Sequence, residues 1–431
     1  MSARRRPPPP PRTRAWRRSL IVAGLCLTSA CRPRDEGTTL RFWGFGREGE
    51  VAQQLVGEFE RTHPGVHVKV QQIPWSAAHE KLLTAIVGRA TPDIVGMGNT
   101  WIPEMVTLGA LAPIDLRLSD SSYFPGIIAT NIVNDTVFGV PWYADTRVLF
   151  YRKDILARAG YASVPETWAG WRQAMVAIKR MVGPDRYAIF VPTNEWPPMA
   201  IFGLQAGSPL IAPNGYGTFT QPAYARAFDF LLSLYRDSLA PAVNSTQIAN
   251  LYQEFARGTF AMYITGPWNL GEFRRRLPPE LQDAWSTAPL PGPDGAASGV
   301  SLAGGSSLVV FRASRHLALA RELAEFLSRP EQQVRFYQLT GDLPARREAW
   351  HDSSLAADRQ AAAFRIQLER AVPTPMVPEW EEVTTKMMDY AEASVRGGQA
   401  AATALAALDA DVNRLLERRR YLLARARAAS R

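Results

Sequence analysis

The stretch TLRFWGFGREGEVAQQLVGEFERTHPG (Thr39–Gly65) and its continuation to Asp115 decide the fold of this chain. TLRFWGF is β-branched and aromatic and has glycine at its end, at Gly44 and again directly after it at Gly46, which predicts a strand. Behind it, Val51, Leu55 and Phe59 recur at four-residue spacing until a His-Pro-Gly sequence ends the pattern, which predicts an amphipathic helix. The segment therefore begins as a strand followed by a helix.

The same alternation repeats twice before Asp115. VHVKVQQI (Val66–Ile73) alternates apolar and polar residues at period two, and SAAHEKLLTAIVGR has helical spacing with Ser76 as the expected cap. DIVGMG (Asp93–Gly98) is a short apolar run typical of a buried strand. Strands separated by helices of this length predict right-handed crossovers, a parallel sheet and an α/β fold.

Two loops of this segment are candidates for a binding site. In a parallel sheet, ligands lie outside the carboxyl ends of the strands. GFGREG follows the first strand and carries Glu48, and Gly98-Asn99-Thr100-Trp101 follows the third, so both loops should meet at one edge. GFGREG has no phosphate-binding lysine and no complete dinucleotide fingerprint, which argues against a nucleotide site.

The first 30 residues have the pattern of an export signal. Residues 1–18 carry seven arginines and no acid, and Ser19–Ala30 form an apolar run that is too short to span a bilayer. The run ends LTSAC, which resembles the lipobox of bacterial lipoproteins, although leucine stands one place further out than that pattern prefers. We expect signal peptide 1–30 and a lipid anchor on Cys31. Cleavage without lipidation and a twin-arginine route through Arg17-Arg18 remain alternatives.

Charge and cysteine content limit the possible partners. The formal net charge of +9 loses seven arginines with the signal and falls to +2, so the basic pI gives no support for nucleic-acid binding. Cys26 lies in the signal and Cys31 would be acylated, which leaves no pair for a disulfide. With 46% hydrophobic residues, about 400 mature residues suffice for two domains with their own cores.

The rest of the chain adds two points where it is expected to pass between domains. Asn134-Asp135 is a hairpin-type turn, and it is followed by GVPWYADTRVLFYRKD, a proline-broken strand that runs directly into a second strand. The Pro/Gly-rich link APLPGPDGAASG then precedes the strand pattern SLAGGSSLVVF. We expect the two crossings near Ala144–Arg147 and Ala296–Ser301.

The order of these segments resembles family 1 extracellular solute-binding proteins of ABC transporters, the class of maltose-binding protein and its sugar-binding relatives. The stretches that carry the resemblance are EFERTHPGVHVKV, TPDIVGMGNTWIPEMVTLGALAPID, GVPWYADTRVLFYRKD, GTFAMYITGPWNLGEF, APLPGP with LAGGSSLVVF, EFLSRPEQQVRFYQLTGDLPAR and VPEWEEV. Each is weak alone, but seven in one order are specific.

The resemblance implies two lobes, each with a central, mostly parallel sheet flanked by helices, and a ligand cleft between them. The expected boundaries are 38–146 plus 300–345 for the N-terminal lobe and 147–299 plus 346–431 for the C-terminal lobe. It further implies an exported, lipid-anchored monomer, at the periplasm or outer membrane surface, that closes on a sugar and delivers it to permease subunits. No cofactor or metal is implied.

The resemblance also implies which residues bind the ligand, because sugar sites combine aromatic faces with planar polar groups. LAGGSSLVV departs from many sugar-binding relatives, which have Trp where Ser306 stands, and this puts one stacking surface in doubt. The implied set is Glu48, Asn99, Thr100, Trp101, Tyr143, Asp145, Glu195, Trp196, Trp268, Gly305, Ser306, Arg346 and Trp380.

Other interpretations remain open for these residues and for the chain. An isolated Trp or Tyr more often packs in a core than against a ligand, and Asp145 would equally serve to cap a turn. A glycosidase would need two carboxylates at a defined separation, which a sequence does not give. The five histidines form no ligand cluster, so zinc is not expected. Glycerol phosphates and polyamines are alternative solutes.

Overall fold

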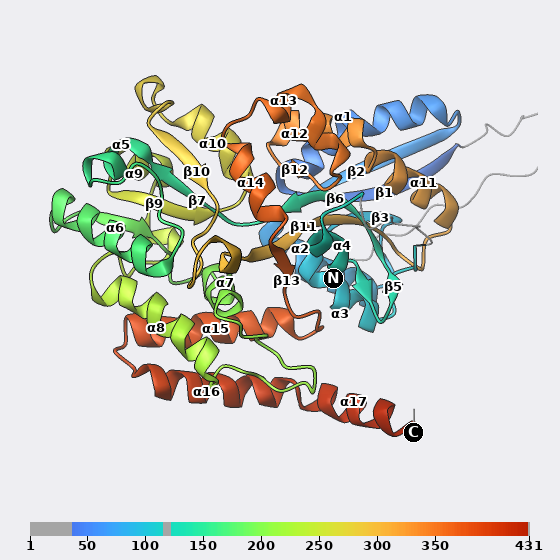
Figure 1. The fold of residues 1–431 in the computed structure, drawn as a ribbon. Coiled ribbons are helices and arrows are strands. Elements are labelled where there is room, and N and C mark those ends of the chain that lie inside the picture. Colours follow the sequence, from blue (N-terminus) through green and yellow to red (C-terminus); the bar gives the residue numbers. More distant parts are fainter. Residues whose placement is uncertain (1–36, 115–121, 430–431) are drawn as a thin grey trace, which may run out of the picture. The chain divides into compact units, whose positions relative to one another are not determined.

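The computed structural model describes residues 37–114 and 122–429 of the 431-residue chain. The predicted signal peptide 1–30 and the predicted lipidation site Cys31 lie outside the described residues. Two main sheets organise the described part, and Figure 1 shows their strands in separate regions. The first sheet has the order β12-β6-β11-β3-β1-β2 with β13 paired to β11, and the second has the order β10-β7-β9-β8.

The first three strands form the predicted parallel unit. They are β1 (Thr38–Phe45), β2 (Val66–Ile73) and β3 (Ile94–Gly98), and both β2 and β3 pair in parallel with β1. Helix α1 (Gly46–Thr62) joins β1 to β2, and α2 (Trp75–Val87) joins β2 to β3. The prediction of Ser76 as the cap of α2 is wrong, because the helix begins at Trp75 and Pro74 occupies the N-cap position without a side-chain bond.

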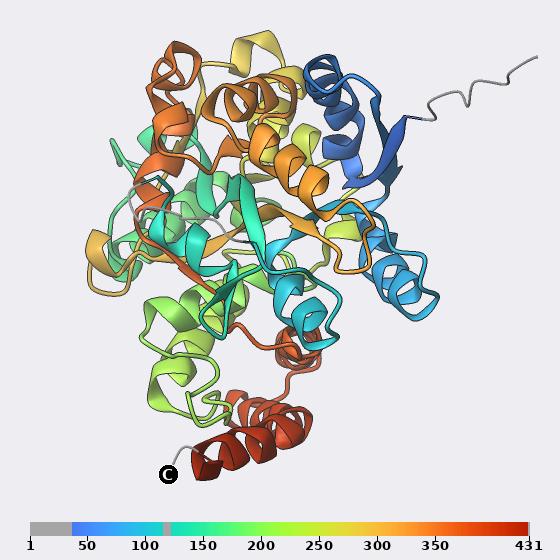
Figure 2. The same cartoon turned by 90° about the vertical axis from the view of Figure 1, so that its right-hand side faces the viewer.

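Alternate residues of β1 face two different cores, as the strand period requires. Leu40 and Phe42 pack in a cluster with residues of α1 and of α11 (Leu317–Leu327). Trp43 and Phe45 pack in a second cluster with residues of α2. Figure 2 shows α1 beside α11 and α12 (Pro330–Thr340), and contacts between these helices hold them together over one face of the sheet.

The first sheet is mixed rather than mostly parallel. Strand β11 (Ser301–Val310) lies between β3 and β6 (Gly139–Asp145) and is antiparallel to both. It enters this sheet from the direction opposite to β3, because the chain returns there from the second sheet. Gly305 has φ +117° and a Cβ there would lie 2.2 Å from the Tyr143 carbonyl oxygen, so only glycine fits beside the irregularity in the β6 and β11 pairing.

The second sheet contains β7 (Val148–Arg152), β8 (Tyr187–Phe190), β9 (Phe260–Thr265) and β10 (Trp285–Ala288). It too is mixed, since β7 is antiparallel to β9 and β10 while β8 is parallel to β9. The chain passes from β6 into β7 through two residues, and returns from β10 to β11. Ser301 Oγ accepts from the Arg147 amide at 3.1 Å and donates to the Arg147 carbonyl at 2.9 Å, which ties the two crossings together.

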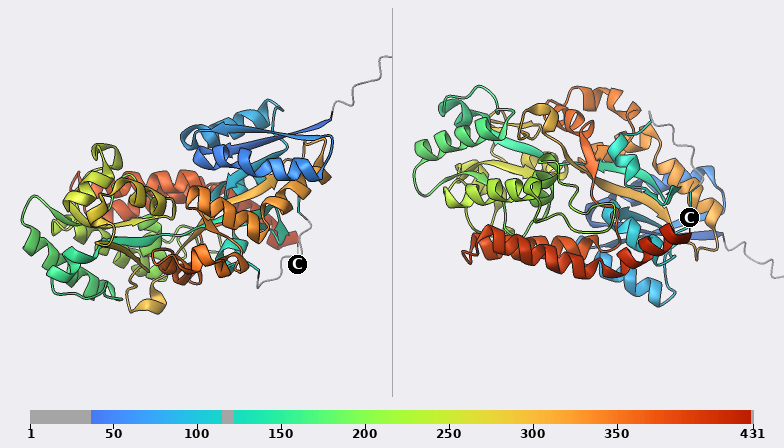
Figure 3. Two further views of the ribbon diagram at one scale, coloured as in Figure 1. Left: turned by 90° about the horizontal axis from the view of Figure 1, so that it is seen from above. Right: turned by 60° about the horizontal axis from the view of Figure 1, so that its bottom comes forward.

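The C-terminal helices pack beside the helices of the second sheet. Helices α15 (Trp380–Val395) and α16 (Ala401–Leu415) contact each other and α8 (Pro222–Arg236), and α16 is followed by α17 (Glu417–Ala429). These red helices run along one side in Figure 3. One large core cluster holds residues of β9, α8, α15 and α16, so the end of the chain is part of this core.

The remaining elements complete the chain. They are η1 (Asn99–Trp101), α3 (Ile102–Thr107), α4 (Pro125–Ala129), β4 (Ile132–Val133), β5 (Thr136–Val137), α5 (Lys153–Arg158), α6 (Trp168–Val182), α7 (Pro197–Gln205), η2 (Ser245–Gln247), α9 (Leu251–Arg257), α10 (Trp268–Arg276), η3 (Pro279–Leu281), η4 (Ala296–Ser298), β12 (Leu343–Pro344), η5 (Glu348–His351), α13 (Ser353–Ala356), α14 (Ala361–Leu368) and β13 (Ala371–Pro373).

Candidate ligand-binding pocket

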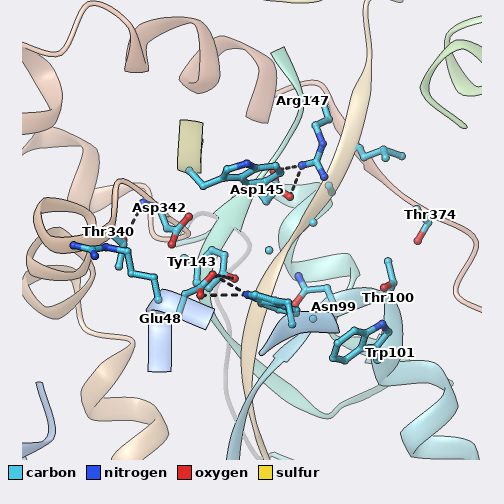
Figure 4. Close-up of a pocket in the computed structure, with 18 of the residues that line it drawn as sticks. Glu48, Asn99, Thr100, Trp101, Tyr143, Asp145, Arg147, Thr340, Asp342 and Thr374 are labelled. Atoms are coloured by element: carbon cyan, nitrogen blue, oxygen red, sulfur yellow. Dashed lines mark hydrogen bonds and ion pairs between the residues drawn. The ribbon is translucent and has the colours of Figure 1, made fainter. Parts of the chain in front are cut away.

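A cavity of about 600 Å³ lies where elements of both sheets meet. Its wall includes the start of α1 and η1 beside the first sheet, and the start of α10 beside the second. Figure 4 shows its side chains, with Glu48, Tyr143 and Asp342 on one side and Thr100 and Trp101 on another. The lining residues are Arg47, Glu48, Trp75, Gly98, Asn99, Thr100, Trp101, Tyr143, Asp145, Arg147, Trp196, Trp268, Glu272, Leu302, Ala303, Gly304, Gly305, Thr340, Asp342, Thr374 and Glu381.

Glu48 anchors a chain of hydrogen bonds on the first side of the pocket. Tyr143 donates its hydroxyl to Glu48 Oε1 at 3.1 Å, and Trp75 Nε1 donates to Glu48 Oε2 at 3.2 Å. Ser306 Oγ in turn donates to the Tyr143 hydroxyl at 3.1 Å. Burial raises the pKa of Glu48, and these neutral donors offset only part of that effect. Burial and the Glu48 charge raise the pKa of Tyr143 well above its usual range, so the phenol stays protonated as a donor.

Asp145 and Arg147 form an ion pair at the crossing between the sheets. Arg147 Nη1 lies 2.5 Å from both oxygens of Asp145, and its guanidinium lies over the Trp268 ring, 4.5 Å from the centroid. Burial raises the pKa of Asp145, and the Arg147 charge opposes that shift. The pair therefore fixes Trp268 in the wall through a cation–π contact.

Asp342 is a second carboxyl group in the same wall and is 4% exposed. Its own amide donates to Thr340 Oγ1 at 3.0 Å. Burial raises the pKa of Asp342 well above its usual range, and the charges of Glu48 and Asp145 add to that rise. Glu48 and Asp342 therefore disfavour each other's ionised form.

A hydrogen bond joins η1 of the first sheet to α15. Thr100 Oγ1 donates to Glu381 Oε1 at 2.8 Å. Next to it, His79 Nε2 lies 2.6 Å from Glu104 Oε2, and this contact raises the pKa of His79. Burial raises the pKa of Glu381. The hydrogen bond between Thr100 and Glu381 thus links two sides of the pocket directly.

Nine of the predicted ligand-binding residues line this pocket. The loops after β1 and β3 meet at one edge, as expected from parallel strands, although the Asn99 amide is itself bonded to Thr130 and Ser307 inside the fold. The nine are Glu48, Asn99, Thr100, Trp101, Tyr143, Asp145, Trp196, Trp268 and Gly305.

Trp380 and Arg346, which were also predicted to bind the ligand, do not line the pocket. Trp380 is 1% exposed and packs edge-to-face against Trp196, with ring centroids 5.6 Å apart. Its ring is therefore covered by the core and is not accessible to a ligand. Arg346 Nε donates to the Ser328 carbonyl at 2.7 Å, and its guanidinium lies over Tyr123. The Arg346 side chain is therefore held between the C-terminal end of α11 and Tyr123.

Glu195 and Ser306 also lie outside the lining, but next to it. Glu195 Oε1 accepts from the Tyr263 hydroxyl at 3.5 Å, and burial raises the pKa of Glu195 while the nearby Arg147 charge lowers it. Ser306 is 1% exposed and acts on the pocket through Tyr143. Glu195 thus contacts Tyr263, and Ser306 contacts the lining residue Tyr143, behind the pocket surface.

Several lining residues were not predicted from the sequence. Arg47 precedes the predicted Glu48, and Trp75 precedes Ser76, which was predicted to cap the helix that in fact begins at Trp75. Asp342 stands in the quoted stretch GDLPAR, where Arg346 was chosen instead, and Glu381 is the neighbour of the chosen Trp380. Arg147 follows Asp145 by two residues in the quoted crossing. The others missed are Glu272, Leu302, Ala303, Gly304, Thr340 and Thr374.

An α/β chain with two sheets and an aromatic, carboxylate-bearing pocket between them has the properties of a protein that binds a small polar solute. The family model of bacterial extracellular solute-binding proteins matches residues 45–334, and the chain belongs to this family. It is the solute-binding component of an ABC importer, an exported binding protein and not an enzyme. The predicted α/β class with two lobes is confirmed by the structures described next.

Solved structures and curated proteins agree with this assignment. The sugar-binding protein MalE of Xanthomonas citri is 46% identical with a TM-score of 0.85, and the match covers 90% of this chain and 99% of that one. The galactooligosaccharide-binding protein of Bacillus subtilis is 26% identical over 390 residues, 89% of this chain and 90% of its own length. The GacH receptor of Streptomyces glaucescens, at 24% identity and a TM-score of 0.77, covers 88% of this chain and 99% of its own and shares the fold.

No helix in the ranges 37–114 and 122–429 has the length and hydropathy that a bilayer crossing requires. Within the same ranges, no group of three or more His, Cys, Asp or Glu residues is arranged to hold a metal ion.

Proposed function

We propose that this chain binds a carbohydrate, a mono- or oligosaccharide, in the described pocket and delivers it to the permease of its importer. The observation that supports the proposal is the combination of four indole rings with carboxylates in one pocket, since sugar C–H faces stack on aromatic rings and hydroxyl groups donate to carboxylates. The four rings are those of Trp75, Trp101, Trp196 and Trp268.

The arrangement of the lining also supports closure on the ligand. Glu48 and Thr100 stand beside the first sheet, whereas Trp196 and Trp268 stand beside the second, so a bound sugar contacts both sides. A ligand that contacts both sides favours the closed state by its extra contacts there. We propose the lobes as 38–146 plus 300–345 and 147–299 plus 346–431, with bending at the crossings near Ala144–Arg147 and Ala296–Ser301.

The descriptions of two relatives also support a carbohydrate ligand. The Xanthomonas citri protein is described as sugar-binding, and the Bacillus subtilis protein as galactooligosaccharide-binding. We further propose that the mature protein is a monomer. We also propose that lipidation of Cys31 holds it at the membrane, because the small residues Thr28, Ser29 and Ala30 directly precede Cys31.

A thermal-shift screen tests the carbohydrate proposal. Purified mature protein is unfolded in the presence of maltose, galactooligosaccharides, arabinooligosaccharides, diacetylchitobiose, acarbose, glycerol phosphates and polyamines. A ligand at about 100 times its Kd adds about 2.7 kcal/mol to the free energy of unfolding, which gives a clear shift of Tm. Stabilisation by a polyamine or a glycerol phosphate with no response to any sugar refutes the proposal.

A further inference from the structure

The cations of the pocket are outnumbered by its carboxylates. Five carboxylates and two guanidinium groups line it. Arg147 binds Asp145 and lies over Trp268, and Arg47 Nη2 donates to the Leu339 carbonyl at 3.0 Å. Among the described lining residues, no lysine or histidine adds a further positive charge. An anionic group on a ligand would therefore meet more carboxylates than guanidinium groups in this lining.

Three of the carboxylates, Glu48, Asp342 and Glu381, have no cationic partner among the described residues, and the first two lie together. In the described part of the chain, neither Glu48 nor Asp342 forms an ion pair. The donors to Glu48 are the neutral groups of Trp75 and Tyr143. Figure 4 shows Glu48 and Asp342 on the same side of the pocket, with Tyr143 near both. This side presents negative charge and acceptor oxygens to whatever enters.

From this distribution we infer that the pocket selects its sugar by charge: it accepts neutral sugars and sugars that carry a basic nitrogen, and it rejects sugar phosphates and uronates. The inference rests on the proposed carbohydrate function and narrows its substrate class.

The physical reason is repulsion in a partly dehydrated site. Charges about 5 Å apart at an effective dielectric of ~20 interact by several times the thermal energy, so a phosphate beside this pair is strongly disfavoured. Burial raises the pKa of both carboxyl groups, and the charge of Arg47 opposes that rise, so a further negative charge is disfavoured beside them. A hydroxyl or an ammonium group donates to these oxygens instead, and an ammonium also gains from the indole faces.

The test measures affinities of matched probes by isothermal titration calorimetry at 0.15 M salt. The probes are glucose, galactose and maltose, each with its 6-phosphate, its uronate and its 2-amino counterpart. For the parent that binds, we expect the phosphate and the uronate to bind at least roughly 30-fold more weakly, and the 2-amino counterpart to bind at least as tightly. A phosphate or uronate within about threefold of a neutral parent that binds overturns the inference while the carbohydrate proposal stands. Binding of the anionic probes alone refutes both.

Variants assign the selection to the two carboxylates. Glu48→Gln and Asp342→Asn should each bring the phosphate affinity closer to that of the neutral parent, by about tenfold. Asp185→Asn removes the same charge from an exposed turn and should leave the ratio unchanged. An equal change of the ratio in Asp185→Asn overturns the assignment, because net charge would then explain it. If a pocket variant does not fold, the probe series on the natural protein still decides the inference.

Discussion

Removal of the Trp268 indole should weaken ligand binding far more than it weakens the fold. The residue is 41% exposed, whereas a core tryptophan such as Trp380 is 1% exposed. About 100 Å² of indole is thus free to be covered by a ligand, which at ~25 cal/mol per Å² corresponds to about 2 kcal/mol. Trp268→Ala should raise Kd roughly 30-fold.

The effect of the same change on stability follows from its contacts. The variant loses the cation–π contact with Arg147, worth about 0.5 to 1 kcal/mol at such a site. With the partly buried remainder of the ring, the loss of unfolding free energy should stay below about 2 kcal/mol, against roughly 3 to 5 kcal/mol for a fully buried tryptophan.

The chain offers a matched control for this experiment. Tyr216 is 50% exposed and the Arg420 guanidinium lies 4.4 Å from its ring centroid, close to the 4.5 Å between Arg147 and Trp268, but Tyr216 does not line the pocket. Tyr216→Ala should lose similar stability and keep its affinity. Gly266→Ala keeps the indole but displaces it, since a Cβ there would lie 2.1 Å from the ring, and it too should weaken binding.

Calorimetric titration with the best sugar from the screen, together with urea unfolding, separates the two effects. An unchanged Kd for Trp268→Ala combined with a stability loss above about 3 kcal/mol would mean that the ring is structural. That result would refute the stacking argument for Trp268.

Three further outcomes are expected. Trp380→Ala should lower the unfolding free energy by roughly 3 to 5 kcal/mol, measured by urea unfolding, because its ring is buried in the core of the second sheet. Asp342→Asn should stabilise the ligand-free protein increasingly as pH rises above about 4. Because the pKa of Asp342 is raised, the natural folded state binds more protons than the unfolded state, and the natural protein loses stability with rising pH. Thermal unfolding from about pH 4 to 8 checks this, and a stability difference between variant and natural protein that shrinks with rising pH contradicts it. Cys31→Ser should move the protein from the membrane fraction to the soluble export fraction, and unchanged fractionation would exclude the lipid anchor.

The residues that could be predicted from sequence are those whose positions follow from strand ends. Glu48 and Trp101 come directly after β1 and β3, and parallel pairing alone brings those ends to one edge. No long-range information is needed beyond the strand and helix patterns. Tyr143 and Asp145, which end the crossing strand β6, were instead implied by the resemblance to the family.

The lining residues that were not predicted have a common physical cause, which is the orientation of a helix or strand about its own axis. Trp380 and Glu381 are neighbours at the start of α15, and successive helix residues point about 100° apart, so one enters the core and the other the pocket. In GDLPAR, the pairing of Pro344 with Tyr143 decides that Asp342 comes beside the pocket. Register of this kind is set by packing across the whole sheet, which the local sequence does not contain.

The way in which the pocket carboxylates are satisfied suggests where a ligand's donors go. Asp145 has Arg147, Glu48 has two neutral donors, and Asp342 is supported mainly by Thr340. Buried charges without a partner oppose folding, and buried polar groups are therefore usually hydrogen-bonded or paired. Departures from this rule concentrate at functional sites. A ligand that donates to Glu48 and Asp342 removes this cost only while it is bound. Binding energy and the stability of the closed protein are therefore linked through the same two side chains.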